Sequence, residues 1–162
     1  MANVRIFLNI LGEINMDLFD WMFIISGFIF FVSMISAILL MANKKMKTVK
    51  IFGVILAVLM FPITGILINY IVVGKDLRFV IYLILILSYL MAELLLDRVF
   101  KIDFRSKTSR HVPYIILEYA ACFSFVFGTL SLDLTIGWII SFFFWTLIGA
   151  LVYYIVKRRK NN

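Results

Sequence analysis

Three long runs of the sequence carry no charged residue, and they restrict the environment in which the chain can fold. They are Trp21–Asn43, Ile51–Gly74 and Leu134–Val156, with 23, 24 and 23 residues. A helix rises about 1.5 Å per residue, so about 20 apolar residues cross the hydrocarbon layer of a bilayer. Each run is therefore long enough to span a membrane as a helix. A strand is excluded because the runs are too long and lack alternating polarity.

Two further apolar runs are interrupted by acidic residues. The first contains Glu93 and Asp97, and the second contains Glu118. Both otherwise match the uncharged runs in length and composition, so we predict an all-α, polytopic bundle of five transmembrane helices. The whole chain of 162 residues then forms one transmembrane domain. The predicted spans are about 19–43, 51–74, 79–100, 112–132 and 134–156.

The composition supports a membrane protein and excludes several other classes. The chain is 64% hydrophobic and 15% charged, whereas soluble domains contain about 45–50% apolar and about 25% charged residues. Cys122 is the only cysteine and His111 the only histidine. An intrachain disulfide and a cysteine-based zinc site are therefore excluded. The sequence identifies no cofactor.

The basic residues predict the orientation of the chain. With the N-terminus outside and the C-terminus in the cytoplasm, 13 of the 16 Lys and Arg residues fall on the cytoplasmic side, as is typical of a multi-pass protein of the cell membrane. We expect the bilayer and its anionic headgroups as partners, and no nucleic acid, because the charges flank the spans. The cytoplasmic basic residues are Lys44, Lys45, Lys47, Lys50, Arg98, Lys101, Arg105, Lys107, Arg110, Lys157, Arg158, Arg159 and Lys160.

Ahead of the first span, apolar residues recur at helical spacing from Val4 to Ile14, and polar residues occupy the other sides. This pattern predicts a short amphipathic helix on the outer membrane surface; a frayed terminus is the alternative.

Small residues four positions apart predict where helices approach one another closely. In the second span Pro62 removes one backbone donor and predicts a kink. The small-residue pairs and triplet are Ser33 and Ala37, Gly53 and Ala57, Gly137 and Ser141, and Ala120, Ser124 and Gly128.

The acidic residues of the third and fourth spans are the candidate site. Taking 1.5 Å per residue from the predicted helix ends, Glu93 lies about 10 Å and Glu118 about 9 Å inside the membrane. The two spans are joined by a short segment, so they should be antiparallel neighbours whose carboxyl groups reach a similar depth. A charge at the bilayer centre costs about 2.5–3.5 kcal/mol, so both should point inwards and be paired, hydrated or protonated.

Other polar residues share helix faces with these glutamates. Four-residue spacing aligns Tyr89 and Asp97 with Glu93, and spacings of three and four align His111 and Tyr114 with Glu118. Two basic residues, Arg98 and Arg110, would lie near the cytoplasmic mouth. The candidate binding residues are Glu93, Asp97, Glu118, Tyr89, Tyr114, Arg98, Arg110 and His111.

Three functions are compatible with this pattern. The first is handling of a small solute, cation or proton, which with only five helices implies a homo-oligomer. The second is a membrane-embedded enzyme that acts on a lipid or prenyl substrate, with acidic, His and Arg groups binding a metal and a phosphate or running acid–base chemistry. The third is a scaffold or interaction subunit, in which the acids only hold helices together.

Overall fold

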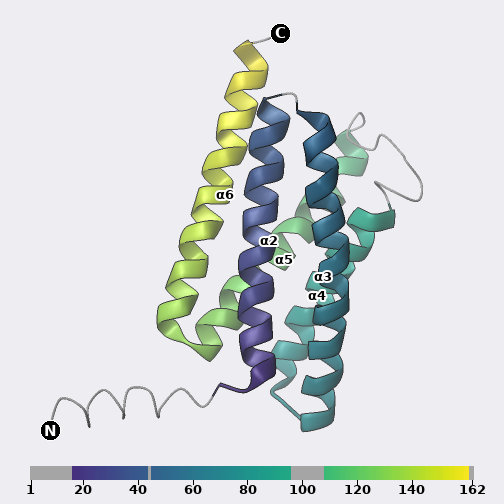
Figure 1. Cartoon of the computed structure of the whole chain (residues 1–162), viewed down its shortest axis with the longest axis vertical. Coiled ribbons are helices and arrows are strands. Elements are labelled where there is room, and N and C mark those ends of the chain that lie inside the picture. The colour runs from purple at the N-terminus through teal and green to yellow at the C-terminus, as the bar shows by residue number, and fades with distance from the viewer. Residues whose placement is uncertain (1–15, 44, 96–107, 161–162) are drawn as a thin grey trace, which may run out of the picture.

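Five helices account for nearly all of residues 16–43, 45–95 and 108–160, the part of the chain that the computed structural model describes. Each is long and apolar enough to cross a membrane, which confirms the predicted number of spans for these residues. Residues 1–15, where we predict the amphipathic helix, lie outside the described part. The helices are α2 (Leu18–Ala42), α3 (Met46–Val73), α4 (Leu77–Leu94), α5 (Thr108–Leu132) and α6 (Leu134–Lys160) (Figure 1).

The ends of the first helices are fixed by local hydrogen bonds. The carboxylate of Asp17 accepts from the Leu18 amide at 2.7 Å, and the Asp17 amide donates to Asp20 at 3.3 Å. This reciprocal capping satisfies backbone donors that an α-helix leaves unpaired at its start. At the other end of the next helix, Gly74 adopts φ 71°, a left-handed conformation that suits a residue without Cβ. The chain then turns into α4, whose first turn is capped by Asp76.

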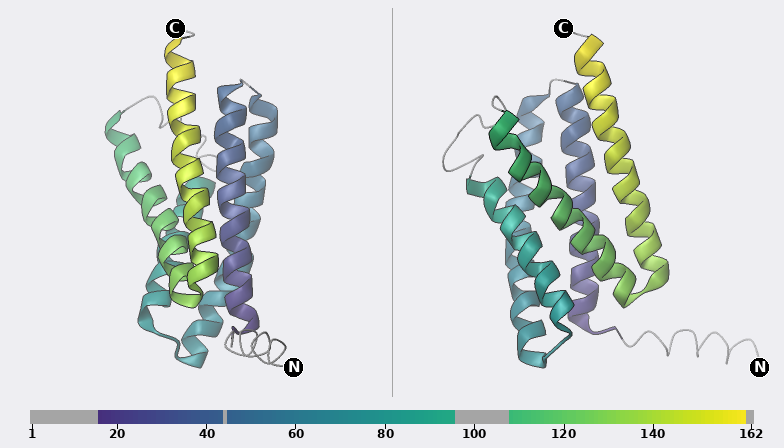
Figure 2. Two further views of the ribbon diagram at one scale, coloured as in Figure 1. Left: turned by 90° about the vertical axis from the view of Figure 1, so that its left-hand side faces the viewer. Right: turned by 180° about the vertical axis from the view of Figure 1, so that it is seen from behind.

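Consecutive helices run in opposite directions, and α2 and α5 each contact three other helices. The helix α2 packs against α3 and α6 and also contacts α5, while α4 lies between α3 and α5. Figures 1 and 2 show that α2, α4 and α6 end towards the side of the bundle that carries the C-terminus.

The connection between α5 and α6 is a single residue, Asp133. Its carboxylate accepts a hydrogen bond from the Ile136 amide at 2.8 Å. A Cβ at Gly137 would lie 2.6 Å from Cα of Leu130, so only glycine allows the two helices to approach this closely. From this corner α5 and α6 diverge towards the opposite side of the bundle (Figure 2).

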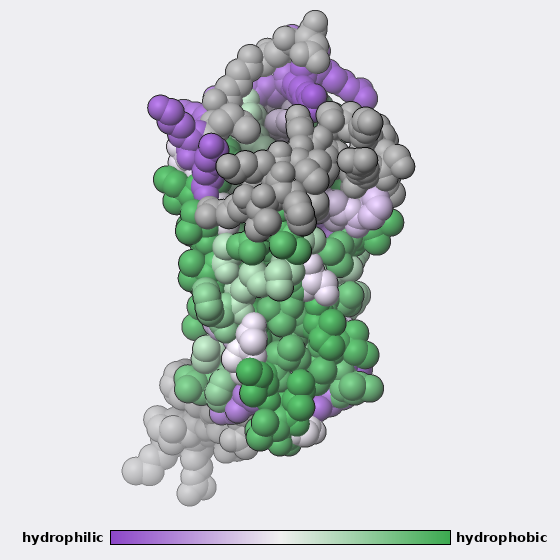
Figure 3. Space-filling view, turned by 90° about the vertical axis from the view of Figure 1, so that its right-hand side faces the viewer, coloured by the Kyte–Doolittle hydropathy of each residue, from purple (hydrophilic) through white to green (hydrophobic). Residues whose placement is uncertain are grey.

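The core combines aliphatic side chains with a cluster of aromatic rings. Phe23, Phe30 and Phe31 of α2 are fully buried and surround Phe125 of α5, with centroid distances of 5.0 Å from Phe30 and 5.4 Å from Phe23. Such pairs contribute about 0.5–1.5 kcal/mol each beyond their buried area. The outer surface is also apolar along the middle of the bundle, as a bilayer requires, and hydrophilic groups gather towards its ends (Figure 3).

The helices differ from the prediction in several details. Within the described residues α4 ends at Leu94, and the predicted continuation to residue 100 lies outside them. The last helix extends to Lys160 because its basic last turn can continue into the headgroup region. The helix α3 continues through Pro62, so the kink stays a prediction.

Close helix approach is seen at Gly128, where a Cβ would lie 2.6 Å from the ring of Phe23. The predicted contact at Gly53 is wrong within this chain, because no atom lies within 4 Å of a Cβ built there. The neighbouring Leu56 is buried, so this part of α3 does pack, but among the described residues not through Gly53.

Candidate functional site

Two buried tyrosines connect α4, α5 and α2 near the cytoplasmic side of the predicted topology. Tyr114 of α5 donates a hydrogen bond to the carboxylate of Glu93, on the last turn of α4. The hydroxyl oxygens of Tyr114 and Tyr89 are 3.2 Å apart, and the Tyr89 hydroxyl lies 3.4 Å from Sδ of Met34. Tyr89 is 0% exposed and Tyr114 8% exposed. The four side chains therefore form a continuous polar path inside the bundle.

The direction of these hydrogen bonds follows from the number of protons. A phenol has one proton to donate and can accept at its oxygen. Since Tyr114 gives its proton to the Glu93 carboxylate, Tyr89 is the donor in the tyrosine pair, and Met34 is its alternative acceptor. Thioether sulfur is a weak acceptor, so the stronger bond is the one to Tyr114.

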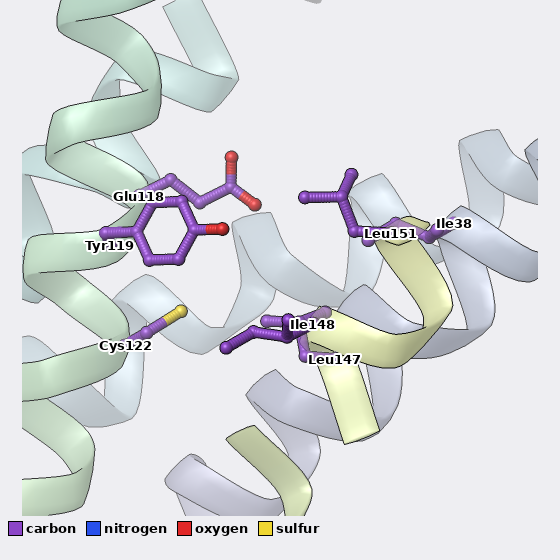
Figure 4. Close-up of a pocket in the computed structure, with 7 residues that line it drawn as sticks. All are labelled: Ile38, Glu118, Tyr119, Cys122, Leu147, Ile148 and Leu151. Atoms are coloured by element: carbon purple, nitrogen blue, oxygen red, sulfur yellow. The ribbon is translucent and has the colours of Figure 1, made fainter. Parts of the chain in front are cut away.

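Glu118 lies one turn beyond Tyr114 on α5 and lines a cavity between α5, α6 and α2 (Figure 4). The cavity offers about 10 Å³ to the centre of a water molecule, which is about the minimum for one water. Its other walls include Cys122, Leu147 and Leu151. Both glutamates also lie close enough to interact electrostatically with the hydroxyl groups of Tyr89 and Tyr114.

The structure thus brings four of the predicted site residues into one region: Tyr89, Glu93, Tyr114 and Glu118. Their role in binding stays a prediction. Asp97 and Arg98 lie outside the described residues. Arg110 and His111 fall in the first turn of α5, but their side chains lie outside the described part as well. Among the described residues, no three His, Cys, Asp or Glu side chains gather closely enough to hold a metal ion.

A second polar cluster lies at the opposite end of the bundle, and the sequence analysis did not predict it. Asp20 of α2 is only 4% exposed. Its carboxylate accepts a hydrogen bond from the Tyr70 hydroxyl at 2.5 Å and pairs with the ammonium of Lys75. The same ammonium lies 4.5 Å from the ring centroid of Tyr70 and 5.3 Å from that of Phe79, within the range of cation–π attraction.

This cluster fastens the start of α2 to the turn between α3 and α4. One signal for it is present in the sequence: Asp17 and Asp20 are spaced three apart before an apolar run, which is the pattern of a helix start. That pattern explains the position of Asp20 but not its partners, which are 50 and 55 residues away.

Just outside the bundle, Asp76 and Arg78 form an exposed ion pair at 2.6 Å. The side-chain hydrogen bond from Arg78, with its backbone hydrogen bond, holds the pKa of the Asp76 carboxyl below its usual value. The pair caps α4 and lies on the surface, so it gives no sign of a binding site.

Comparisons with protein-family models, curated proteins and solved structures found no significant match to this chain. The geometry of the two glutamates and their tyrosine neighbours is therefore the main structural indication of its function.

Proposed function

We propose that the chain is a multi-pass protein of the cell membrane that binds a proton or small cation at Glu93 and Glu118. Its N-terminus is outside and its C-terminus is cytoplasmic. The basic last turn of α6, Lys157 to Lys160, supports this orientation, because positive residues are retained on the cytoplasmic side. The site then lies towards the cytoplasmic end of α4 and α5.

The observation that carries the proposal is the polar path from Glu93 through Tyr114 and Tyr89 to Met34. With Glu93 ionised, Tyr89 donates to Tyr114 and Tyr114 donates to the carboxylate. With Glu93 protonated, the direction reverses: Glu93 donates to Tyr114, Tyr114 to Tyr89, and Tyr89 to the sulfur of Met34. Every hydroxyl keeps an acceptor in both states, so a proton can be taken up without leaving a buried polar group unsatisfied.

Glu118 provides the second carboxylate. It borders a cavity with room for about one water, which can carry a proton or complete the coordination of a small cation at Glu118. Glu93 and Glu118 are both half-buried, and a carboxylate held partly away from water is stabilised by pairing, hydration or protonation.

The partners of the proposed protein are the bilayer, anionic headgroups at the cytoplasmic face, and further copies of the chain. Five helices leave little room for a complete translocation path within one chain, and a homo-oligomer supplies additional walls.

The proposal is tested with purified protein in liposomes that carry a pH gradient. Proton flux and the pH-dependent infrared band of protonated carboxyl groups are recorded for the wild type, Glu93→Gln and Glu118→Gln. We expect each variant to lower the flux and Glu93→Gln to remove part of the infrared change. Asp76→Asn is the matched control: it also removes one carboxylate, but from the exposed pair at the other end.

Two outcomes contradict the proposal. If neither flux nor infrared signal depends on the glutamates while both variants melt at lower temperature, the acids serve helix packing and the scaffold interpretation replaces this one. If turnover of a lipid or prenyl substrate is abolished by the same variants without any flux, the site belongs to an enzyme.

A further inference from the structure

The outer face of α3 carries an apolar groove, and among the described residues only α3 and Leu94 of α4 line it. It has a volume of about 680 Å³ and is open to the side. Its lining includes Val54, Val58, Phe61 and Gly65 of α3, and Leu94 of α4 closes one side. Phe61 is 80% exposed, and no atom lies within 4 Å of a Cβ built on Gly65. Phe61 therefore forms a protruding wall of the groove, and Gly65 forms its floor, where there is space for additional atoms.

Two lysines lie on the same face of the helix, beyond the end of the groove. At 100° per residue, Lys47 and Lys50 point in the same direction as Val54, Val58 and Phe61. Both lysines are exposed. Lys45 is also exposed, but it precedes the helix and falls on the opposite side.

The groove is long enough to hold one acyl chain. From Val54 to Gly65 the helix rises about 17 Å, close to the thickness of half of the hydrocarbon layer, about 15 Å, and the lining residue Ile68 extends the groove past the middle of the bilayer. Lys50 lies about 6 Å beyond Val54 along the helix axis, at the depth of the headgroups. An acyl chain therefore fits along the groove while its phosphate reaches the lysines.

From this placement we infer that the groove of α3 is a binding site for one anionic phospholipid of the cytoplasmic leaflet. An acyl chain lies between Phe61 and Leu94, and the headgroup phosphate pairs with Lys47 and Lys50. This inference rests on the proposed orientation, and it assigns the proposed contact with anionic headgroups to Lys47 and Lys50. A second copy of the chain fits less well, because two α3 helices joined through this face would bring four like-charged lysines together.

The test is a titration of the detergent-solubilised full chain with phosphatidylglycerol or phosphatidylcholine, with bound lipid counted by native mass spectrometry. We expect one preferred phosphatidylglycerol site. Lys47→Gln or Lys50→Gln should each weaken it about five-fold, the factor expected for one basic residue at an anionic surface. Lys45→Gln is the matched control and should leave the affinity unchanged.

A second pair of variants tests the groove itself. Gly65→Leu fills the floor and should reduce binding of both lipids. Gly149→Leu makes the same change on α6, where a Cβ also meets open space, and should not reduce it. All variants should keep the wild-type melting temperature, since the changed side chains point away from the core.

Equal retention of the two lipids by wild type and lysine variants overturns the inference. The inference is also overturned if the wild type is a dimer and Gly65→Leu converts it to monomers, because the groove is then occupied by a second copy of the chain. The groove shares no residue with Glu93 or Glu118, so the lysine variants should keep the wild-type proton flux. The lipid-binding inference and the proposed proton-binding function can therefore be refuted independently of each other.

Discussion

The ion pair between Asp20 and Lys75 offers a sharp test of how the start of α2 is held to the turn between α3 and α4. Replacing Lys75 by Met keeps the length of the side chain and its packing on Tyr70 and Phe79, but it leaves the buried Asp20 carboxylate without its counter-charge. Removing one partner of a buried pair costs about 3–5 kcal/mol.

The structure places the expected loss at the lower end of that range. The Lys75 side chain is 24% exposed and that of Asp20 6% exposed, so water reaches the pair from one side. Tyr70 still donates its 2.5 Å hydrogen bond, and such a bond to a charged group contributes about 1.5–3 kcal/mol. We therefore expect Lys75→Met to lower the free energy of unfolding by about 3 kcal/mol.

The assay is reversible unfolding in mixed micelles, followed by circular dichroism. The double variant Asp20→Asn with Lys75→Met should be more stable than Lys75→Met alone, because the uncompensated charge is gone while the hydrogen bond from Tyr70 is retained. Arg78→Met, which breaks the exposed pair with Asp76, is the control and should be indistinguishable from wild type. A loss below about 1 kcal/mol for Lys75→Met, as for an ordinary surface pair, would refute the reasoning.

Three further predictions concern packing, titration and orientation. Gly137→Ala should destabilise the protein by about 1–3 kcal/mol, because the new methyl group meets the backbone of the preceding helix. Gly149→Ala should cause no such loss, because the methyl group there meets open space. Equal melting temperatures for the two variants would contradict this prediction. In an NMR titration, the pKa of Asp76 should lie below that of an ordinary Asp, and in Arg78→Gln it should rise towards the ordinary value. The stabilising contribution of the Asp76 carboxylate is therefore present at neutral pH and is lost as the pH falls through the lowered pKa. In intact cells, Arg78→Cys should react with an impermeant maleimide, whereas Arg159→Cys should react only after the membrane has been permeabilised. The opposite pattern would show that the proposed topology is inverted.

The sequence was sufficient to predict the five helices, because length and apolar composition alone decide whether a segment can span a bilayer. It also placed Tyr89, Glu93, Tyr114 and Glu118 in one region. Four-residue spacing sets which side chains share a helix face, and the short connection between their two helices makes those helices neighbours.

Contacts between helices far apart in the chain could not be predicted in this way. The partners of Asp20 and the position of Met34 beside Tyr89 depend on where α2 sits, and periodicity within one helix does not contain that information. Gly53 illustrates the same limit: small residues predict that a face can be packed closely, but the faces of the other helices decide whether it is.

The single residue between α5 and α6 limits how this part of the molecule can rearrange. Because the two helices are joined so closely at Asp133, neither can slide past the other, and their relative motion is limited to a change in the angle between them. The cavity beside Glu118, Leu147 and Leu151 lies about halfway along both helices, where a change in the angle between them already alters their separation. A change in the angle between α5 and α6 would therefore alter the width of this cavity, and the ends of the two helices that lie away from Asp133 would move most.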